Sequence, residues 1–167
     1  MAVLLALLGW GGYEGHGWLM GPIWAFGQET AVHALRLMGS GLFDKHPKLK
    51  VVLGHLGETL PFLVWRVDHA IARPGAAKKI SFRDIFCNNF WITTSGNFSN
   101  PALMCCVQEL GVDRILFAID WPFVVNPPGV EWMKTVPLCD EDKAKSLALF
   151  CCARPRSESA TFCSKPV

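Results

Sequence analysis

Two apolar runs in this sequence end in ionisable residues of the types that transfer protons. Residues 51–53 are followed by His55 and, three residues later, by Glu58, and residues 115–119 are followed directly by Asp120. A histidine changes charge near neutral pH, and a carboxylate within reach orients its ring and favours its charged form. A carboxylate that leaves an apolar strand is costly unless a metal ion, an imidazole or a helix N-terminus compensates it. The two endings therefore predict acid–base or metal chemistry.

Other interpretations of these residues stay open at the level of sequence. His55 could be a core histidine that is hydrogen-bonded to the backbone, and Asp120 could be the N-cap of a following helix. Pro122 and the residue after it are more typical of a turn than of a helix start. Arg66 lies eight residues after Glu58, two turns further along an expected helix, so it could pair with Glu58 or bind a substrate anion. It could equally be a solvated surface arginine.

The elements around these residues alternate along the chain. Helices are predicted where apolar residues recur at helical spacing, over residues 22–42, 58–72, 100–110 and 140–150. Short apolar runs predict strands over residues 49–55, 90–97 and 114–121, the first of them buried on both faces. This alternation is typical of parallel βαβ units and indicates an α/β fold. In such folds the chemistry lies at the carboxyl ends of the strands, where His55, Asn97 and Asp120 are expected.

The composition describes a folded domain that acts on small molecules. The 167 residues are 51% hydrophobic and 18% charged, which suits one domain with a substantial core. A net charge of +2 without a Lys/Arg cluster argues against a nucleic-acid partner. The apolar run over residues 2–8 is far shorter than the ~20 residues that span a bilayer, so we expect no membrane partner and interpret the run as a buried strand. The seven cysteines include no C-x-x-C pair, which favours reduced thiols and a cytoplasmic location.

Three stretches of the sequence resemble the amidohydrolase-related decarboxylases. They are WAFGQETAVHALRLMGSGLFDKHPKLKVVLGHLGETLPFLVWRVDH (residues 24–69), TTSGNF (residues 93–98) and GVDRILFAIDWPF (residues 111–123). Within that family they are most similar to the fungal 2,3-dihydroxybenzoate decarboxylases. The resemblance covers residues 13–150, which leaves residues 1–12 as a non-matching N-terminal segment and residues 151–167 as a divergent, disordered tail.

The resemblance implies a fold, a reaction and a cofactor. Members of the family are (β/α)8 barrels of the metal-dependent hydrolase superfamily, and this chain would supply the C-terminal half of such a TIM barrel. They are carboxy-lyases that remove CO2 from a hydroxybenzoic acid without an organic cofactor. One divalent metal ion (Zn, Mn or Mg) is bound at the carboxyl end of the barrel. The expected partner is a small aromatic acid, and the expected assembly is a homo-oligomer.

The resemblance also assigns roles to particular residues. Asp120 matches an aspartate that ligates the metal and is placed to protonate the ring carbon, and His55 matches the histidine beside it. Glu58 matches the glutamate that orients that histidine, and Arg66 matches an arginine of the same network.

Three further residues are expected in the substrate pocket. Phe123 matches a residue of the pocket wall in the family, and we also expect Trp24 and Asn97 to contact the substrate.

The sequence departs from the family pattern at the metal site. The family carries a Glu-x-His pair on its first strand and a further metal histidine in a Leu-His-Pro-Arg stretch. This sequence has no Leu-His-Pro-Arg stretch, and its one Glu-x-His (residues 14–16) lies in a glycine-rich loop and not on an apolar strand. Asp120 is then the one expected metal ligand that the sequence retains. Two other hypotheses therefore stand beside decarboxylation. The chain could be an impaired relative that binds phenolics or pairs with a full-length relative, or it could hydrolyse a lactone or an amide.

Overall fold

The structure is a computed structural model and describes residues 13–72 and 81–152 of the chain. Its sheet has the strand order β1-β2-β3, with β1 (Val51–Leu53), β2 (Phe90–Thr93) and β3 (Ile115–Leu116). Both neighbouring pairs run parallel. Because helices separate successive strands, the predicted α/β class is confirmed.

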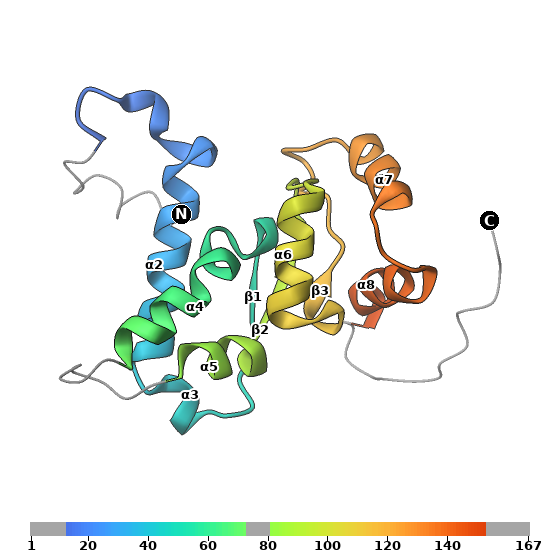
Figure 1. The fold of residues 1–167 in the computed structure, drawn as a ribbon. Coiled ribbons are helices and arrows are strands. Elements are labelled where there is room, and N and C mark those ends of the chain that lie inside the picture. Colours follow the sequence, from blue (N-terminus) through green and yellow to red (C-terminus); the bar gives the residue numbers. More distant parts are fainter. Residues whose placement is uncertain (1–12, 73–80, 153–167) are drawn as a thin grey trace.

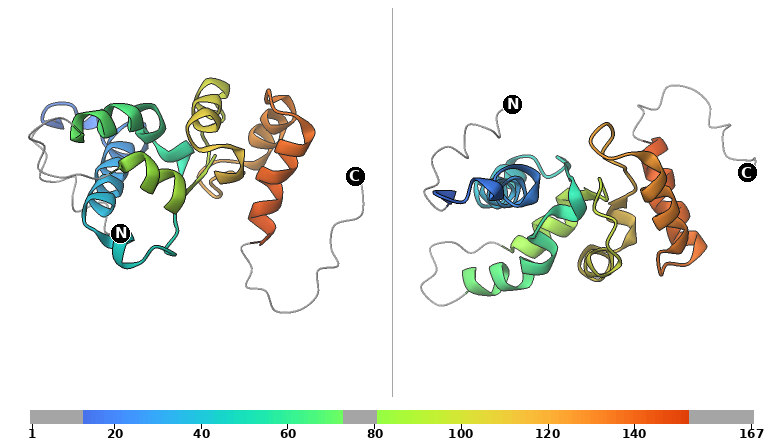
Figure 2. Two further views of the ribbon diagram at one scale, coloured as in Figure 1. Left: turned by 60° about the horizontal axis from the view of Figure 1, so that its bottom comes forward. Right: turned by 90° about the horizontal axis from the view of Figure 1, so that it is seen from above.

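Helices account for most of the remaining described residues. The α-helices are α2 (Ala25–Gly39), α3 (Leu42–Lys45), α4 (Leu60–Ile71), α5 (Phe82–Asn89), α6 (Asn100–Leu110), α7 (Asn126–Thr135) and α8 (Asp140–Cys152). Short 3-10 turns are η3 (Gly17–Leu19), η4 (Gly21–Ile23), η5 (His55–Gly57) and η6 (Val112–Arg114). Helix α2 lies at one end of the molecule, α7 and α8 lie at the other, and the sheet runs between them (Figure 1). Figure 2 shows the same order from two further sides.

Aromatic and aliphatic side chains pack the sheet against the helices. The ring of Phe90 in β2 is tilted against the rings of Phe43 and Phe86, with centroids 5.4 and 5.6 Å apart. Phe90 and Ile92 are fully buried, and Ile115 of β3 is 1% exposed. Alternate residues of β2 therefore point into one core, which fixes the strand register through burial.

The opposite face of the sheet is open in the described part of the chain. Val52 of β1 is 56% exposed, so the prediction that this strand is buried on both faces is wrong. Its register partner Trp91 shares that face and is covered by two cationic side chains, Arg114 at 4.1 Å and Lys50 at 5.4 Å from the ring centre. Within the described residues, helices therefore cover one face of the sheet, and the face that carries Val52 is open.

Helix α2 begins later than the sequence predicted, whereas α6 begins where it was predicted. Pro22 lies in the 3-10 turn η4, and α2 begins only at Ala25. Helix α6 spans the predicted residues 100–110 and is capped by Ser99, whose side chain accepts a hydrogen bond from the Ala102 amide. Serine is a favourable cap because its oxygen satisfies a free amide of the first turn.

Helices α5 and α7 are among those that were not predicted, and two predicted segments cannot be compared. Helix α5 has a Ser81 cap on the Asp84 amide, and α7 begins with two prolines, both of which are typical helix-start signals. The segment 1–12, where a strand was predicted over residues 2–8, and the tail from residue 153 lie outside the described residues. Within the described residues, no helix is long and apolar enough to cross a bilayer.

Gly129 of α7 provides a test of how closely α7 packs beside the loop that follows β3. A Cβ at this buried position would lie 2.5 Å from Ile119 Cδ1 and 2.5 Å from Phe98 Cζ. We expect Gly129→Ala to lower the free energy of unfolding by about 1–3 kcal/mol, as overpacking does. Urea unfolding followed by circular dichroism measures the change.

Gly17→Ala is the matched control, because a Cβ at Gly17 meets no described atom within 4 Å. Equal stability of the two variants would show that α7 does not pack as described.

Candidate active site

The carboxyl end of β1 leads into a tight left-handed turn that presents two ionisable side chains. His55, Leu56 and Glu58 have φ values of 50°, 56° and 58°. Two backbone hydrogen bonds close the turn, from the Gly57 amide to the Gly54 carbonyl and from the Glu58 amide to the His55 carbonyl. Left-handed backbone is unfavourable for residues with a Cβ and persists where surrounding contacts hold it, often at functional sites. Leu56, 1% exposed, anchors the turn in the core.

The imidazole of His55 lies between two carboxylates. Its Nδ1 is 2.6 Å from Glu58 Oε1, and its Nε2 is 3.7 Å from Asp120 Oδ2. The first distance is a short, charge-assisted hydrogen bond. The second is longer than a direct hydrogen bond, so Asp120 acts on His55 through its charge. The structure thus brings together the two strand ends that the sequence singled out.

The surroundings of His55 favour its protonated form. The hydrogen bond that the His55 ring donates to Glu58 raises the His55 pKa above its ordinary value of 6.5, and the charges of Glu58 and Asp120 raise it further. Partial burial opposes these effects. The cluster therefore holds a proton at Nε2 or Nδ1 at a higher pH than a solvated histidine does.

Asp120 projects from a turn and not from a helix. Its φ is 80°, and its carbonyl accepts hydrogen bonds from the amides of Phe123 and Val124 at 2.9 and 3.1 Å. Helix α7 begins six residues later with Val125 at its N-cap, so the alternative of an Asp120 N-cap is excluded. Gly96, with φ 80°, approaches this turn so closely that a Cβ there would lie 3.0 Å from Val124 Cγ2 and 3.7 Å from Asp120 Oδ2.

These groups line a pocket of about 690 Å³ at the carboxyl edge of the sheet. Its wall is made by the end of η4 and the start of α2, the His55 turn, the turn Ser95–Asn97 and the loop Asp120–Val124. Ser95, with φ 33°, adds another left-handed residue, and its hydroxyl hydrogen-bonds with that of Thr93. The pocket is large enough for a single aromatic ring with polar substituents.

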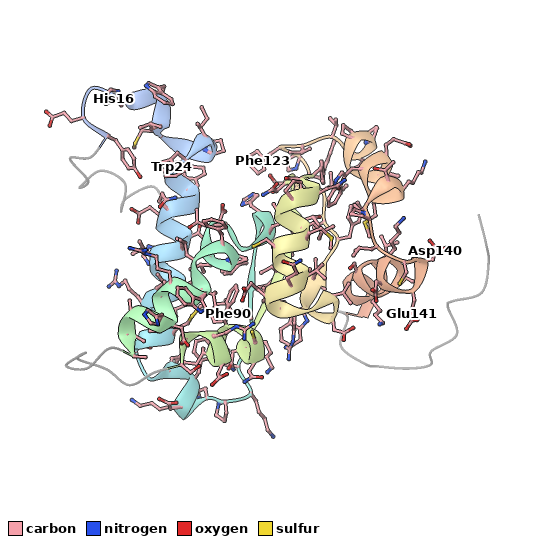
Figure 3. The ribbon with its side chains drawn as sticks, in the orientation of Figure 1. His16, Trp24, Phe90, Phe123, Asp140 and Glu141 are labelled. Carbon is pink, nitrogen blue, oxygen red and sulfur yellow. The ribbon has the colours of Figure 1, made fainter. Side chains whose placement is uncertain are left out.

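The predicted pocket residues lie in different positions. Phe123 lines the pocket although it is 87% exposed, and Asn97 lines it and donates a hydrogen bond to the His55 carbonyl at 3.4 Å. Trp24 is 49% exposed and lies outside the described pocket wall, whereas Phe26 forms part of it. Figure 3 shows Trp24 and Phe123 both in the upper part of the view, above Phe90.

The sequence predicted Glu58 and Arg66 two turns apart on one helix, and the structure does not confirm this. Glu58 precedes α4 and has a left-handed backbone, so helical spacing does not relate the two residues. Arg66 is exposed on α4, and the described pocket wall does not include it.

Gly27 is a pocket residue that the sequence analysis missed. A Cβ at this position would lie 2.8 Å from Glu58 Oε2, so the glycine lets α2 approach the carboxylate that holds His55. A glycine inside a helical pattern was the available signal.

The described residues do not form a complete divalent metal site. Asp120 and His55 are potential ligands, but no group of three or more His, Cys, Asp or Glu side chains in residues 13–72 and 81–152 is arranged to hold an ion. Zinc sites take at least three protein ligands and manganese sites prefer several oxygens. These residues alone therefore do not fit a complete metal centre.

Comparisons with known proteins identify relatives of the chain. A family model described as Amidohydrolase matches residues 6–148. The chain is 52% identical over 137 residues to the gamma-resorcylate decarboxylase of Polaromonas sp., a match that covers 80% of this chain and 42% of that protein. The chain thus spans about two fifths of the length of the curated relatives it matches.

Solved structures resemble the described fold. A 2,6-dihydroxybenzoate decarboxylase crystallised with 2,6-dihydroxybenzoate superposes with a TM-score of 0.75 at 51% identity, over 80% of this chain and 42% of that one. A dihydroxybenzoic acid decarboxylase from Polaromonas sp. with bound manganese and the inhibitor 2-nitroresorcinol gives a TM-score of 0.78 at 49% identity, over 86% of this chain and 46% of that one. The three-stranded α/β unit corresponds to part of such a TIM barrel, as predicted.

Glu58→Gln tests the hydrogen bond that orients the imidazole. We expect the variant to lower the His55 pKa, because the Glu58 hydrogen bond is the largest cause of its elevation. A ¹H–¹⁵N NMR titration of the histidine ring measures the shift. Glu131→Gln, an exposed change on α7 beside Lys134, is the control and should leave the titration unchanged. An unaltered His55 pKa in Glu58→Gln would contradict the described contact.

The same pKa shift predicts how stability depends on pH. Because the folded-state pKa of His55 lies above the unfolded value of 6.5, its contribution to stability is fully present below about pH 6.5. It is lost as the pH rises through the folded-state pKa. Urea unfolding across this range should show a loss with rising pH that is smaller in Glu58→Gln. A loss of equal size in both proteins would assign it to other groups.

Proposed function

The chain belongs to the amidohydrolase family, and we propose that its pocket takes part in the non-oxidative decarboxylation of a hydroxybenzoic acid. The observation that carries the proposal is the imidazole of His55 held between two carboxylates in a pocket of about 690 Å³. Such a cluster supplies a proton inside a site that accepts an aromatic ring. Relatives named as decarboxylases of dihydroxybenzoates support this choice of reaction.

The proposed step is a proton transfer followed by loss of CO2. A proton is delivered to the ring carbon that bears the carboxylate, so that carbon becomes tetrahedral and the ring loses aromaticity. The bond to the carboxylate carbon then breaks, its electron pair returns to the ring, and CO2 leaves. The product is a phenol with hydrogen in place of the carboxylate. No external oxidant or reductant is needed.

Each residue around His55 has its own role in this proposal. Asp120 delivers the proton to the ring, and protonated His55 re-protonates Asp120 across the 3.7 Å separation of Nε2 and Oδ2. Glu58 orients the imidazole of His55 and favours its protonated form, because the hydrogen bond between them raises the His55 pKa. Phe26 and Phe123 would pack on the substrate ring from the pocket wall.

A divalent metal ion would be coordinated by Asp120 in this site. In the proposal Asp120 is one ligand of a divalent ion, and the further ligands of that ion come from outside the described residues. A related solved structure contains bound manganese. Such an ion would orient the substrate carboxylate and screen its charge.

The substrate class is a benzoic acid with a hydroxyl beside the carboxylate. An electron-donating hydroxyl at that position makes the carboxylate-bearing carbon basic enough to accept a proton. The sequence resemblance favours 2,3-dihydroxybenzoate and the solved relatives favour 2,6-dihydroxybenzoate, so both belong in the test.

A second candidate function is binding of an aromatic acid without turnover. The observation that favours it is the lack of a three-ligand cluster within the described residues. Binding of 2,6-dihydroxybenzoate by calorimetry, together with no phenol formed under any metal, would select this function over decarboxylation.

The decarboxylase proposal predicts a defined product. The purified chain, incubated with 2,6- or 2,3-dihydroxybenzoate and Mn²⁺, Zn²⁺ or Mg²⁺, should form resorcinol or catechol, measured by chromatography. In D2O the product should carry one deuterium at the carbon that lost CO2, because the proton comes from an exchangeable group. No phenol with any metal would overturn the activity of this chain.

Asp120→Asn tests the proton donor. We expect turnover to fall by about 10²–10⁴-fold, the usual contribution of general acid catalysis. The amide keeps the size of the side chain, and asparagine tolerates the left-handed backbone at this position. Glu131→Gln, on the outer surface of α7, should keep full turnover. Turnover in Asp120→Asn equal to that of the unaltered chain would exclude Asp120 as the donor.

A further inference from the structure

We propose that Thr94 and Asn97, in the turn after β2, are positioning residues that set the separation between His55 and Asp120. The inference rests on the proposed function in so far as that separation matters for proton transfer. The positioning itself is a property of the chain without substrate.

Thr94 extends the sheet beyond the end of β3. The main-chain ladder reaches Leu116, whose carbonyl accepts from the Thr94 amide at 3.0 Å. The Thr94 side chain then continues the pairing: its hydroxyl donates to the Ala118 carbonyl at 2.6 Å and accepts from the Ala118 amide at 2.9 Å. Thr94 is 2% exposed, so water does not compete for these bonds. The hydroxyl therefore fixes the backbone two residues before Asp120.

Asn97 holds the other group from the same turn. Its amide donates to the Thr94 carbonyl at 2.9 Å, which closes the turn over Gly96. Its side-chain amide donates to the His55 carbonyl at 3.4 Å. One turn of four residues thus contacts the backbone of both His55 and the Asp120 strand.

The His55–Asp120 pair needs such support because it is not held by a direct bond. The 3.7 Å between Nε2 and Oδ2 exceeds a hydrogen-bond distance, so no short contact fixes it. Both residues also have left-handed backbone, with φ of 50° and 80°, a conformation that relaxes when its surroundings loosen. The separation is therefore set by the backbone contacts on either side, and Thr94 and Asn97 make contacts to both strands.

The test removes the Thr94 hydroxyl while keeping the shape of the side chain. Thr94→Val lacks the hydroxyl and Thr94→Ser retains it. We expect the Ala118 amide to exchange with solvent about tenfold faster in Thr94→Val and at the original rate in Thr94→Ser, measured by NMR hydrogen exchange. Crystal structures of the variants should show the His55 Nε2–Asp120 Oδ2 separation lengthened in the valine variant and unchanged in the serine variant.

Thr93→Val is the matched control. It removes the hydroxyl of the preceding residue, which contacts Ser95 and not Ala118. Ala118 exchange should stay as in the unaltered chain. If Thr94→Val does not fold, Asn97→Ala tests the second arm, and the same lengthening is expected because the bond to the His55 carbonyl is lost. An unchanged separation in a folded Thr94→Val or Asn97→Ala variant overturns the proposal.

Activity separates this inference from the proposed function. If the unaltered chain forms phenol, Thr94→Val should lower kcat with little change in KM, and Thr94→Ser should restore kcat. Unchanged kcat in a Thr94→Val variant whose His55–Asp120 separation is lengthened would show that this separation does not matter for catalysis. Absence of phenol from the unaltered chain would refute the function alone, since the exchange and distance measurements need no substrate.

Discussion

The arrangement depends on one imidazole that lies between two carboxylates. Glu58 contacts His55 on one side at 2.6 Å and Asp120 faces it on the other at 3.7 Å. Two carboxylates that share a pocket repel each other, and a protonated histidine between them offsets this repulsion. The raised pKa of His55 is the consequence. The unequal distances make the two acids different in kind, because Glu58 is bound to the ring whereas Asp120 is left to interact with whatever enters the pocket.

The described part of the chain gathers pocket residues from three neighbouring strand ends. The His55 turn follows β1, the Thr94–Asn97 turn follows β2, and the Asp120 turn follows β3. Parallel strands deliver these turns to one edge of the sheet, which is why groups distant in sequence meet there. A complete metal shell is not formed by the same residues. The described residues therefore form the cluster of His55 with two carboxylates without completing a metal centre.

Much of this arrangement could be predicted from the sequence, and its failures have physical causes. Apolar periodicity located the strands, and the meeting of strand ends predicted the contact of His55 with Asp120. The position of Arg66 could not be predicted, because the left-handed backbone of Glu58 delays the start of α4 and is invisible to a periodicity argument. The role of Thr94 was missed because a threonine after an apolar run is typical of any strand, and only coordinates show its hydroxyl replacing a ladder bond.

The left-handed backbone of His55, Glu58 and Asp120 narrows the mutational tolerance of the pocket independently of its chemistry. Asparagine, aspartate and histidine adopt this conformation more readily than other residues with a Cβ, and β-branched residues adopt it poorly. A saturation library at these positions would therefore rank substitutions by backbone compatibility as well as by proton transfer. At these three positions the backbone therefore restricts which side chains fit, even in a variant from which no proton transfer is required.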